Sequence, residues 1–141
     1  MAEDSVERKL RAIFAADVKG YSKMMGEDEV GTYQTLTANL KSIRSIISEH
    51  KGRVFSSPGD AVMAEFSSVV DAVRCAVELQ DKIEAANADV PEDQKMQFRI
   101  GVNLGDVIHD GEQVYGDGVN IAARIETLAE PGGVSIARNV Y

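Results

Sequence analysis

The order of strand-like and helix-like segments constrains the fold of this chain more than any other feature. Residues 10–18 form a short, mostly apolar run, as expected of a buried strand. Beyond Ser22 an amphipathic helical spacing follows and continues to residues 51–52, which predicts one long helix. Two short strands, a second helix and a strand over 96–104 come next. This βαββαβ order is typical of a ferredoxin-like core.

The two short strands form a predicted hairpin. They cover residues 53–57 and 61–66, and Pro58-Gly59-Asp60 between them favours a tight turn. The second helix then begins after a cap at Ser67 or Ser68. Asp60 is therefore expected at a hairpin tip.

The rest of the chain extends this core. A hairpin is predicted around Asp110-Gly111, a third helix over 117–128 and a last strand over 134–137. We therefore predict an α+β fold with a ferredoxin-like core, an antiparallel-rich sheet and helices packed on one face of it. In that topology the first strand lies between later strands, which brings Asp17 beside Asp60.

The charge balance narrows the class of ligand. Lys and Arg total 15 against 23 Asp and Glu, so the net charge is −8. This charge repels the phosphates of nucleic acids and of anionic lipid surfaces, and we expect neither as a general partner. A small polyanion could still bind where a cation or a few basic side chains offset its charge.

Cysteine content and hydropathy indicate the compartment. Cys75 is the single cysteine, so no intrachain disulfide can form. The first nine residues lack the apolar run of a signal peptide, and no stretch approaches the ~18 apolar residues of a membrane span. We expect a cytoplasmic protein with no membrane segment in this chain.

Asp17 and Asp60 are the candidate metal ligands. Two carboxylates held close together repel each other, a cost usually offset by a cation or a shared proton. Their hard oxygen atoms favour Mg²⁺ or Mn²⁺. The alternative is that each Asp is only a turn former or helix cap, which is the commoner role of Asp in turns.

Two further groups of polar residues could bind a phosphorylated ligand. The turn through Gly20, Tyr21 and Ser22 leads from a strand into a helix and exposes backbone N–H groups, although a plain strand-to-helix turn has the same pattern. Asn120 and Arg124 lie four residues apart and share a helix face. An Arg there could neutralise charge on a phosphate and an Asn could hold a sugar oxygen, or both could simply be solvated.

Four blocks in this order resemble the catalytic domain of class III adenylate and guanylate cyclases of bacterial type: FAADVKGYS, GRVFSSPGDAVMAEF, FRIGVNLGDV and VYGDGVNIAAR. The resemblance implies that Asp17 and Asp60 bind two Mg²⁺ or Mn²⁺ ions, assisted by the Val18 carbonyl. The Gly20–Ser22 turn would hold the triphosphate. Asn120 and Arg124 would position the ribose and stabilise the α-phosphate transition state, across the interface of a head-to-tail homodimer.

The chain departs from the family pattern at the base-recognition positions. Ser56 and Gln113 stand where adenylate cyclases usually have Lys and Asp, and they also differ from the guanylate cyclase pair. Both can still hydrogen-bond a purine edge. The family domain usually continues past Tyr141 through more strands with a phosphate-binding Lys, so we expect a catalytic domain over 10–141 that lacks its C-terminal strands, after an extension over 1–9.

The leading hypothesis is a purine nucleotide cyclase, a phosphorus-oxygen lyase of cyclic-nucleotide signalling. Its substrate would be ATP, with GTP as the alternative, and its products the 3′,5′-cyclic nucleotide and pyrophosphate. One alternative is a degenerate cyclase homology domain that binds nucleotide or a partner without turnover. A third hypothesis is another two-metal enzyme with the same fold, such as a diguanylate cyclase. The VNIAAR block argues against it, because those enzymes lack this block.

Overall fold

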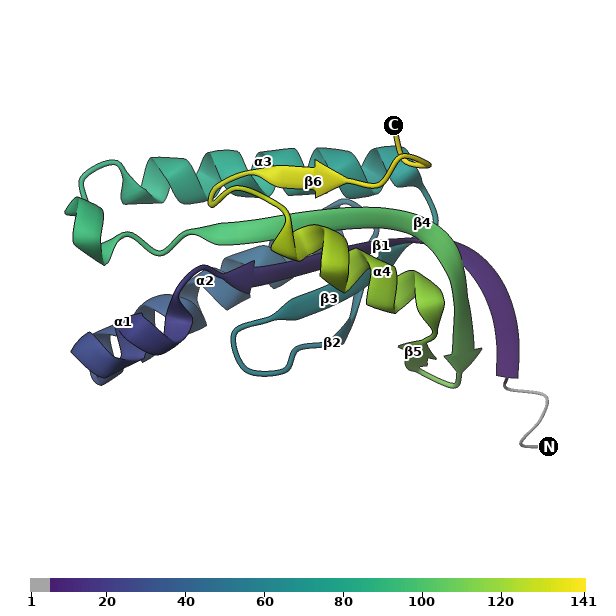
Figure 1. Ribbon diagram of the computed structural model, residues 1–141, viewed down its shortest axis with the longest axis horizontal. Helices are drawn as coiled ribbons and strands as arrows, with labels where there is room; N and C mark the ends of the chain where they lie inside the picture. Colours follow the sequence, from purple (N-terminus) through teal and green to yellow (C-terminus); the bar gives the residue numbers. More distant parts are fainter. Residues whose placement is uncertain (1–5) are drawn as a thin grey trace.

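A six-stranded sheet organises the chain, and its two longest strands lie side by side at the centre (Figure 1). The computed structural model describes residues 6–141. β1 (Val6–Val18) pairs antiparallel with β4 (Phe98–Asp110) along its whole length and with β3 (Val62–Phe66) on its other side. The predicted position of the first strand between later strands is confirmed. The strand itself begins four residues before the predicted run.

Shorter strands complete the sheet. β2 (Arg53–Ser56) and β5 (Gln113–Tyr115) give the order β2-β3-β1-β4-β5, and β6 (Val134–Ile136) pairs parallel to β4. Both predicted hairpins are present. The separate strands expected before and after residue 105 are one strand, because β1 pairs with β4 continuously through that point.

The first helical region is two helices, so the prediction of a single long helix is wrong. α1 (Tyr21–Glu27) and α2 (Glu29–Glu49) meet at Asp28, whose φ of −154° is not helical. The Asp28 side chain accepts a hydrogen bond from the Gly31 N–H at 3.0 Å and so caps α2. The apolar periodicity carries no sign of this break.

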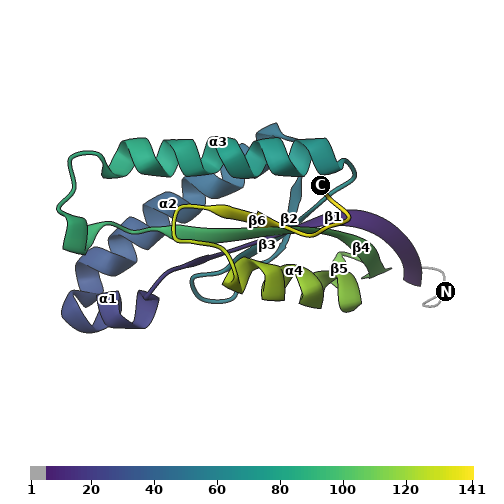
Figure 2. The same ribbon diagram turned by 45° about the horizontal axis from the view of Figure 1, so that its top comes forward.

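The helices cover both faces of the sheet, which corrects the prediction of helices on one face. Alternate β1 residues such as Phe14 pack in the main core with α2 and α3 (Val69–Asn87), which Ser68 caps as predicted. The intervening residues such as Ile13 pack with α4 (Asp117–Thr127) in a smaller cluster. Figure 2 shows the sheet between α3 and α4.

Glycines let α4 lie directly against the sheet. A Cβ added to Gly101 of β4 would lie 2.4 Å from the Glu126 backbone nitrogen, and one added to Gly118 of α4 would lie 2.6 Å from the Asp106 carbonyl oxygen. Any side chain at either position would push the helix away. The sequence pattern did not reveal this second layer, because α4 meets the sheet through backbone more than through large apolar side chains.

The main core is built from aromatic and aliphatic side chains on the other face. Phe14, Phe66 and Phe98 are at most 1% exposed, and the first two rings have centroids 6.2 Å apart. Burial of a side chain of this size stabilises the fold by about 1.5–3 kcal/mol. Within residues 6–141, no helix is long and apolar enough to cross a membrane.

Candidate functional site

The sheet topology brings Asp17 and Asp60 to the same end of the sheet. Asp17 is the penultimate residue of β1, and Asp60 lies in the turn that leads into β3, the neighbour of β1. The backbone N–H of Val18 donates a hydrogen bond to Oδ2 of Asp60 at 3.0 Å. Two carboxylates that are distant in sequence are thus held next to each other.

Two charged side chains that the sequence did not single out complete this cluster. Arg99 of β4 faces Asp17 in the strand register, and its Nε lies 3.9 Å from Asp17 Oδ1. Glu126 of α4 approaches from the helix side and is 5% exposed. Burial, followed by the adjacent Asp17, raises the pKa of Glu126 to about 8, although Arg99 acts in the opposite direction.

This cluster fits a divalent cation. Oδ1 of Asp17, Nε of Arg99 and Oε2 of Glu126 are all buried without a hydrogen-bond partner, an arrangement that native proteins rarely leave uncompensated. Residues 6–141 contain no group of three or more His, Cys, Asp or Glu side chains that could hold a metal by themselves. A cation at Asp17 and Asp60 would therefore complete its ligands with water, backbone carbonyls or phosphates, as Mg²⁺ usually does.

The predicted phosphate turn follows directly after β1. Gly20 has a φ of 65°, a left-handed conformation that favours glycine, and its carbonyl accepts the Met24 N–H at 3.1 Å. Tyr21 is partly buried and packs against the main core, while Ser22 is exposed. The turn is therefore anchored by Tyr21 and open to solvent at Ser22.

Asn120 and Arg124 share the outer face of α4, as the helical spacing predicts. Both side chains are exposed, and neither has a hydrogen bond or ion pair to another side chain within the described residues. Ala122 between them points to the sheet and is fully buried. The polar pair is thus available to a ligand or to another protein chain.

The two base-recognition candidates lie on strands that are not neighbours in the sheet. Ser56 ends β2 at a local irregularity of the β2–β3 pairing and is partly buried, whereas Gln113 begins β5 and is exposed. β2 and β5 stand at opposite ends of the strand order. Unlike Asp17, Val18 and Asp60, these two positions are not brought together by direct strand pairing.

A hollow of about 480 Å³ adjoins the candidate metal site. It is lined by Tyr21 from the turn after β1, by Gly59 next to Asp60, and by residues of α2 that include Lys41 and Arg44. Lys41 and Arg44 place two positive charges beside these turns, although the net charge of the chain is negative. This hollow provides positive charge for an anionic ligand near Asp60.

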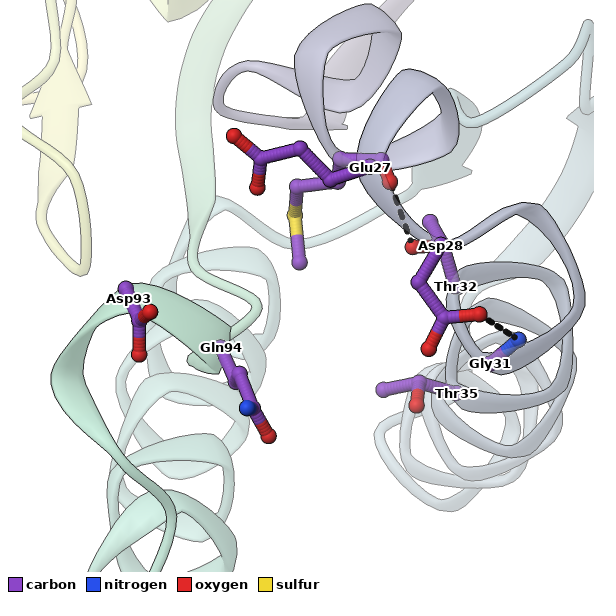
Figure 3. A pocket seen from close by; sticks show the side chains of 8 residues that line it. Glu27, Asp28, Gly31, Thr32, Thr35, Asp93 and Gln94 are labelled. Carbon is purple, nitrogen blue, oxygen red and sulfur yellow. Dashed lines mark hydrogen bonds between the residues drawn. The ribbon is translucent and has the colours of Figure 1, made fainter.

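A second hollow, of about 300 Å³, lies between the α1–α2 junction and the 3-10 turn η2 (Glu92–Gln94) (Figure 3). Its acidic side chains are Glu27, Asp28 and Asp93, and the Asp28 carboxylate is engaged by Gly31 as the cap of α2. This lining is unfavourable for a triphosphate. The candidate site is therefore the cluster around Asp17, not this hollow.

Glu126, like Arg99, is a residue of this cluster that lies outside the predicted site. It falls on the buried stripe of α4, in step with Val119, Ala122 and Ala129 at spacings of three and four. A lone carboxylate on an apolar helix face is unusual, since such groups are seldom buried without a partner. That position in the stripe is the signal that would have revealed it.

The fold and these residues define the class of protein. A family model described as "Adenylate and Guanylate cyclase catalytic domain" matches residues 7–141. The chain therefore belongs to the adenylate and guanylate cyclase catalytic-domain family, and the resemblance seen in the sequence is confirmed.

Curated relatives are longer than this chain. The chain is 49% identical over 142 residues to "Putative adenylate cyclase 3" of Rhizobium meliloti (strain 1021), a match to 100% of this chain and 24% of that protein. It is 28% identical over 141 residues to "Adenylate cyclase" of Streptomyces coelicolor, covering 95% of this chain and 34% of the relative. The chain thus corresponds to a minor part of each relative's length.

Solved structures of the family have the same fold. An adenylate/guanylate cyclase/hydrolase from Silicibacter pomeroyi superposes with a TM-score of 0.90 at 34% identity, over 96% of this chain and 79% of that one. The adenylyl cyclase CyaB from P. aeruginosa gives a TM-score of 0.84 at 21% identity, over 96% of this chain and 80% of the other. The second likeness supports the fold alone.

Proposed function

We propose that this chain converts a purine nucleoside triphosphate, ATP in preference to GTP, to the 3′,5′-cyclic monophosphate and pyrophosphate, as part of cyclic-nucleotide signalling. The ribose 3′-oxygen forms a bond to the α-phosphorus, the bond from that phosphorus to the bridging oxygen breaks, and pyrophosphate leaves. The hydroxyl proton passes to solvent. The observation that carries the proposal is the hydrogen bond from the Val18 N–H to Asp60, which holds Asp60 at the end of the strand that carries Asp17, in a chain of the cyclase family.

The role proposed for Asp17 and Asp60 is to hold two Mg²⁺ or Mn²⁺ ions, with the Val18 carbonyl assisting. When bound, these ions would offset the triphosphate charge and lower the pKa of the attacking hydroxyl. The chain's own part is orientation: the Val18 N–H fixes Asp60, and Arg99 faces Asp17 at 3.9 Å. The adjacent Gly20–Ser22 turn would bind the triphosphate, with Ser22 exposed to receive it.

Asn120 and Arg124 are proposed to act on the substrate held by a second copy of the chain. Arg124 would stabilise charge on the α-phosphate in the transition state, and Asn120 would orient the ribose. Their exposure and lack of side-chain partners within the described residues support this role. Ile121 and Leu128 on the same helix are 39% and 77% exposed, and exposed apolar side chains beside Arg124 favour a protein interface.

Ser56 and Gln113 are the proposed contacts to the purine base. Neither is charged, and each can both donate and accept a hydrogen bond. Because adenine and guanine can both satisfy such groups, we expect the preference for ATP over GTP to be small. The ratio of kcat/KM for ATP and GTP in the full-length protein measures it, and a Gln113→Ala change should lower kcat/KM for the preferred base.

The direct test is product formation. Full-length protein with Mn²⁺ and ATP should form cyclic nucleotide, and Asp17→Ala should abolish this activity. Asp71→Ala is the matched control, because Asp71 lies at the start of α3 and outside the cluster. Full-length protein that binds nucleotide but forms no product with ATP or GTP would contradict the proposal and support a binding-only domain, the alternative suggested by Ser56 and Gln113.

A mixing experiment tests the shared active site. Asp17→Ala and Arg124→Ala variants should each be inactive alone. Mixed in equal amounts, they should recover about a quarter of the wild-type activity, because half of the dimers are mixed and each of those has one intact site. No recovery, with dimers present, would show that both residues serve the same protomer's site.

A further inference from the structure

Two glutamates are buried in the described part of the chain, and their surroundings are opposite. Glu65 accepts hydrogen bonds from Arg53 Nε at 2.9 Å and Nη2 at 2.6 Å, and one of its oxygens lies 2.7 Å from His109 Nε2. Glu126 is as deeply buried, but its Oε2 has no hydrogen-bond partner. The packing around Glu65 explains its burial. Glu126 instead lies beside a second carboxyl group, that of Asp17, and no basic side chain among residues 6–141 is hydrogen-bonded to its Oε2.

The sheet makes room for Glu126 at a specific place. Gly101 lies next to Arg99 on the same face of β4, and a Cβ there would approach the Glu126 nitrogen to 2.4 Å and its Cα to 2.7 Å. β4 pairs Gly101 with Ala15 and Arg99 with Asp17. The missing side chain at 101 thus lets the backbone of Glu126 rest on the strand beside the end of β1 where Asp17 lies.

The charge of this cluster is unbalanced. When ionised, Asp17, Asp60 and Glu126 carry three negative charges, and Arg99 supplies one positive charge. A buried carboxylate without hydrogen bonds strongly disfavours folding unless a counter-charge is present. Oδ1 of Asp17 and Oε2 of Glu126 both lack a hydrogen bond, and the only ion pair at Asp17 Oδ1 within the described residues is the long one to Arg99 at 3.9 Å. One divalent cation would balance the remaining two negative charges.

We propose that Glu126 is a positioning residue of the Asp17–Asp60 metal site. This inference rests on one part of the proposed function, the binding of cations at Asp17 and Asp60. Glu126 lies beside Asp17, and in this proposal it acts by orienting Asp17 rather than as a direct ligand. Its negative charge favours cation binding, and its position between helix and strand restricts the orientations open to the Asp17 and Arg99 side chains.

The test is Mn²⁺ binding by the full-length protein without nucleotide, followed by the electron paramagnetic resonance signal of free Mn²⁺. Glu126→Gln keeps the volume and removes the charge, and we expect its Mn²⁺ Kd to rise by about 10–100-fold, the usual effect of losing a group that orients a ligand. Glu126→Asp keeps the charge and should retain more of the affinity. Glu130→Gln, at an exposed position just after α4, is the matched control and should bind like wild type.

Thermal unfolding in EDTA separates positioning from packing. There Glu126→Gln should have a Tm close to that of wild type, because the amide has nearly the same volume and can also hydrogen-bond to Asp17. Unchanged Mn²⁺ affinity in Glu126→Gln would overturn the inference and leave the proposed function standing. Weaker binding together with a lowered Tm in EDTA would show a packing role and would also overturn it. If the wild-type protein bound no Mn²⁺, the proposed metal site would be refuted, and the inference about Glu126 would fail with it.

Discussion

Gly101→Ala should lift helix α4 from the sheet and destabilise the fold. The added Cβ would lie 2.4 Å from the Glu126 nitrogen and 2.9 Å from the Ala122 carbonyl oxygen. Ordinary contacts of carbon lie near 3.5–4.0 Å, so the helix backbone must move by about 1 Å. Backbone atoms cannot rotate away as a flexible side chain can. The strain therefore falls on the packing of the whole helix.

The expected loss of stability follows from two opposing effects. Overpacking a core contact costs about 1–3 kcal/mol, and replacing Gly by Ala inside a strand returns roughly 0.5–1 kcal/mol. A backbone clash this short lies at the upper end of the range for overpacking, so the free energy of unfolding should fall by about 2 kcal/mol in all. For a domain of this size, that lowers Tm by roughly 4–8 °C.

The assay is thermal unfolding followed by circular dichroism, with Gly26→Ala as the matched control. Gly26 lies in α1, and a Cβ there would meet no heavy atom within 4 Å, so that change should leave Tm unchanged or raise it slightly. A Gly101→Ala protein as stable as wild type would show that α4 does not rest on β4 at this point. The account of Glu126 would then lose its structural basis.

Three other outcomes are expected. In metal-free protein the pKa of Glu126 is raised from 4.5 to about 8, so the stability that Glu126 contributes is present below pH 4.5 and is lost as the pH rises toward 8. Denaturant unfolding in EDTA should therefore give a free energy of unfolding that falls between pH 4.5 and 8, and Glu126→Gln should make this fall smaller. Burial, and then Glu78, raise the pKa of Cys75 to about 12, so Ellman's reagent should react with the native thiol no faster than the protein unfolds. Ser68→Ala should lower the free energy of unfolding by about 1 kcal/mol, because Ser68 Oγ accepts the Asp71 N–H at the start of α3.

Local sequence patterns were sufficient to predict most of the helices and strands. Apolar spacing and the Ser68 cap predicted α3, and the turn at residues 58–60 predicted the β2–β3 hairpin. The break between α1 and α2 was missed because it depends on a single capping contact, from Asp28 to the Gly31 N–H, which interrupts the backbone without interrupting the apolar pattern. Periodicity reports which face is buried, not whether the helix is continuous.

The candidate site was predictable only as far as strand topology reaches. The antiparallel pairing of β1 with β3 brings Asp17 beside Asp60, and the βαββαβ order implies that pairing. Glu126 enters the cluster through the packing of α4 on the second face of the sheet. That packing depends on Gly101 matching the helix backbone, a relation between positions 25 residues apart that no local pattern contains.

Helix α4 connects the two halves of the proposed chemistry. Arg124 and Glu126 are two residues apart, so their side chains leave the helix about 200° apart. The exposed Arg124 therefore faces outward, where a second chain would bind, while the buried Glu126 faces the Asp17 cluster of its own chain. A shift of α4 driven by contact at its outer face would move Glu126 against Asp17. If the proposed dimer and the proposed metal site both form, dimer assembly and metal affinity are therefore expected to be linked through this one helix.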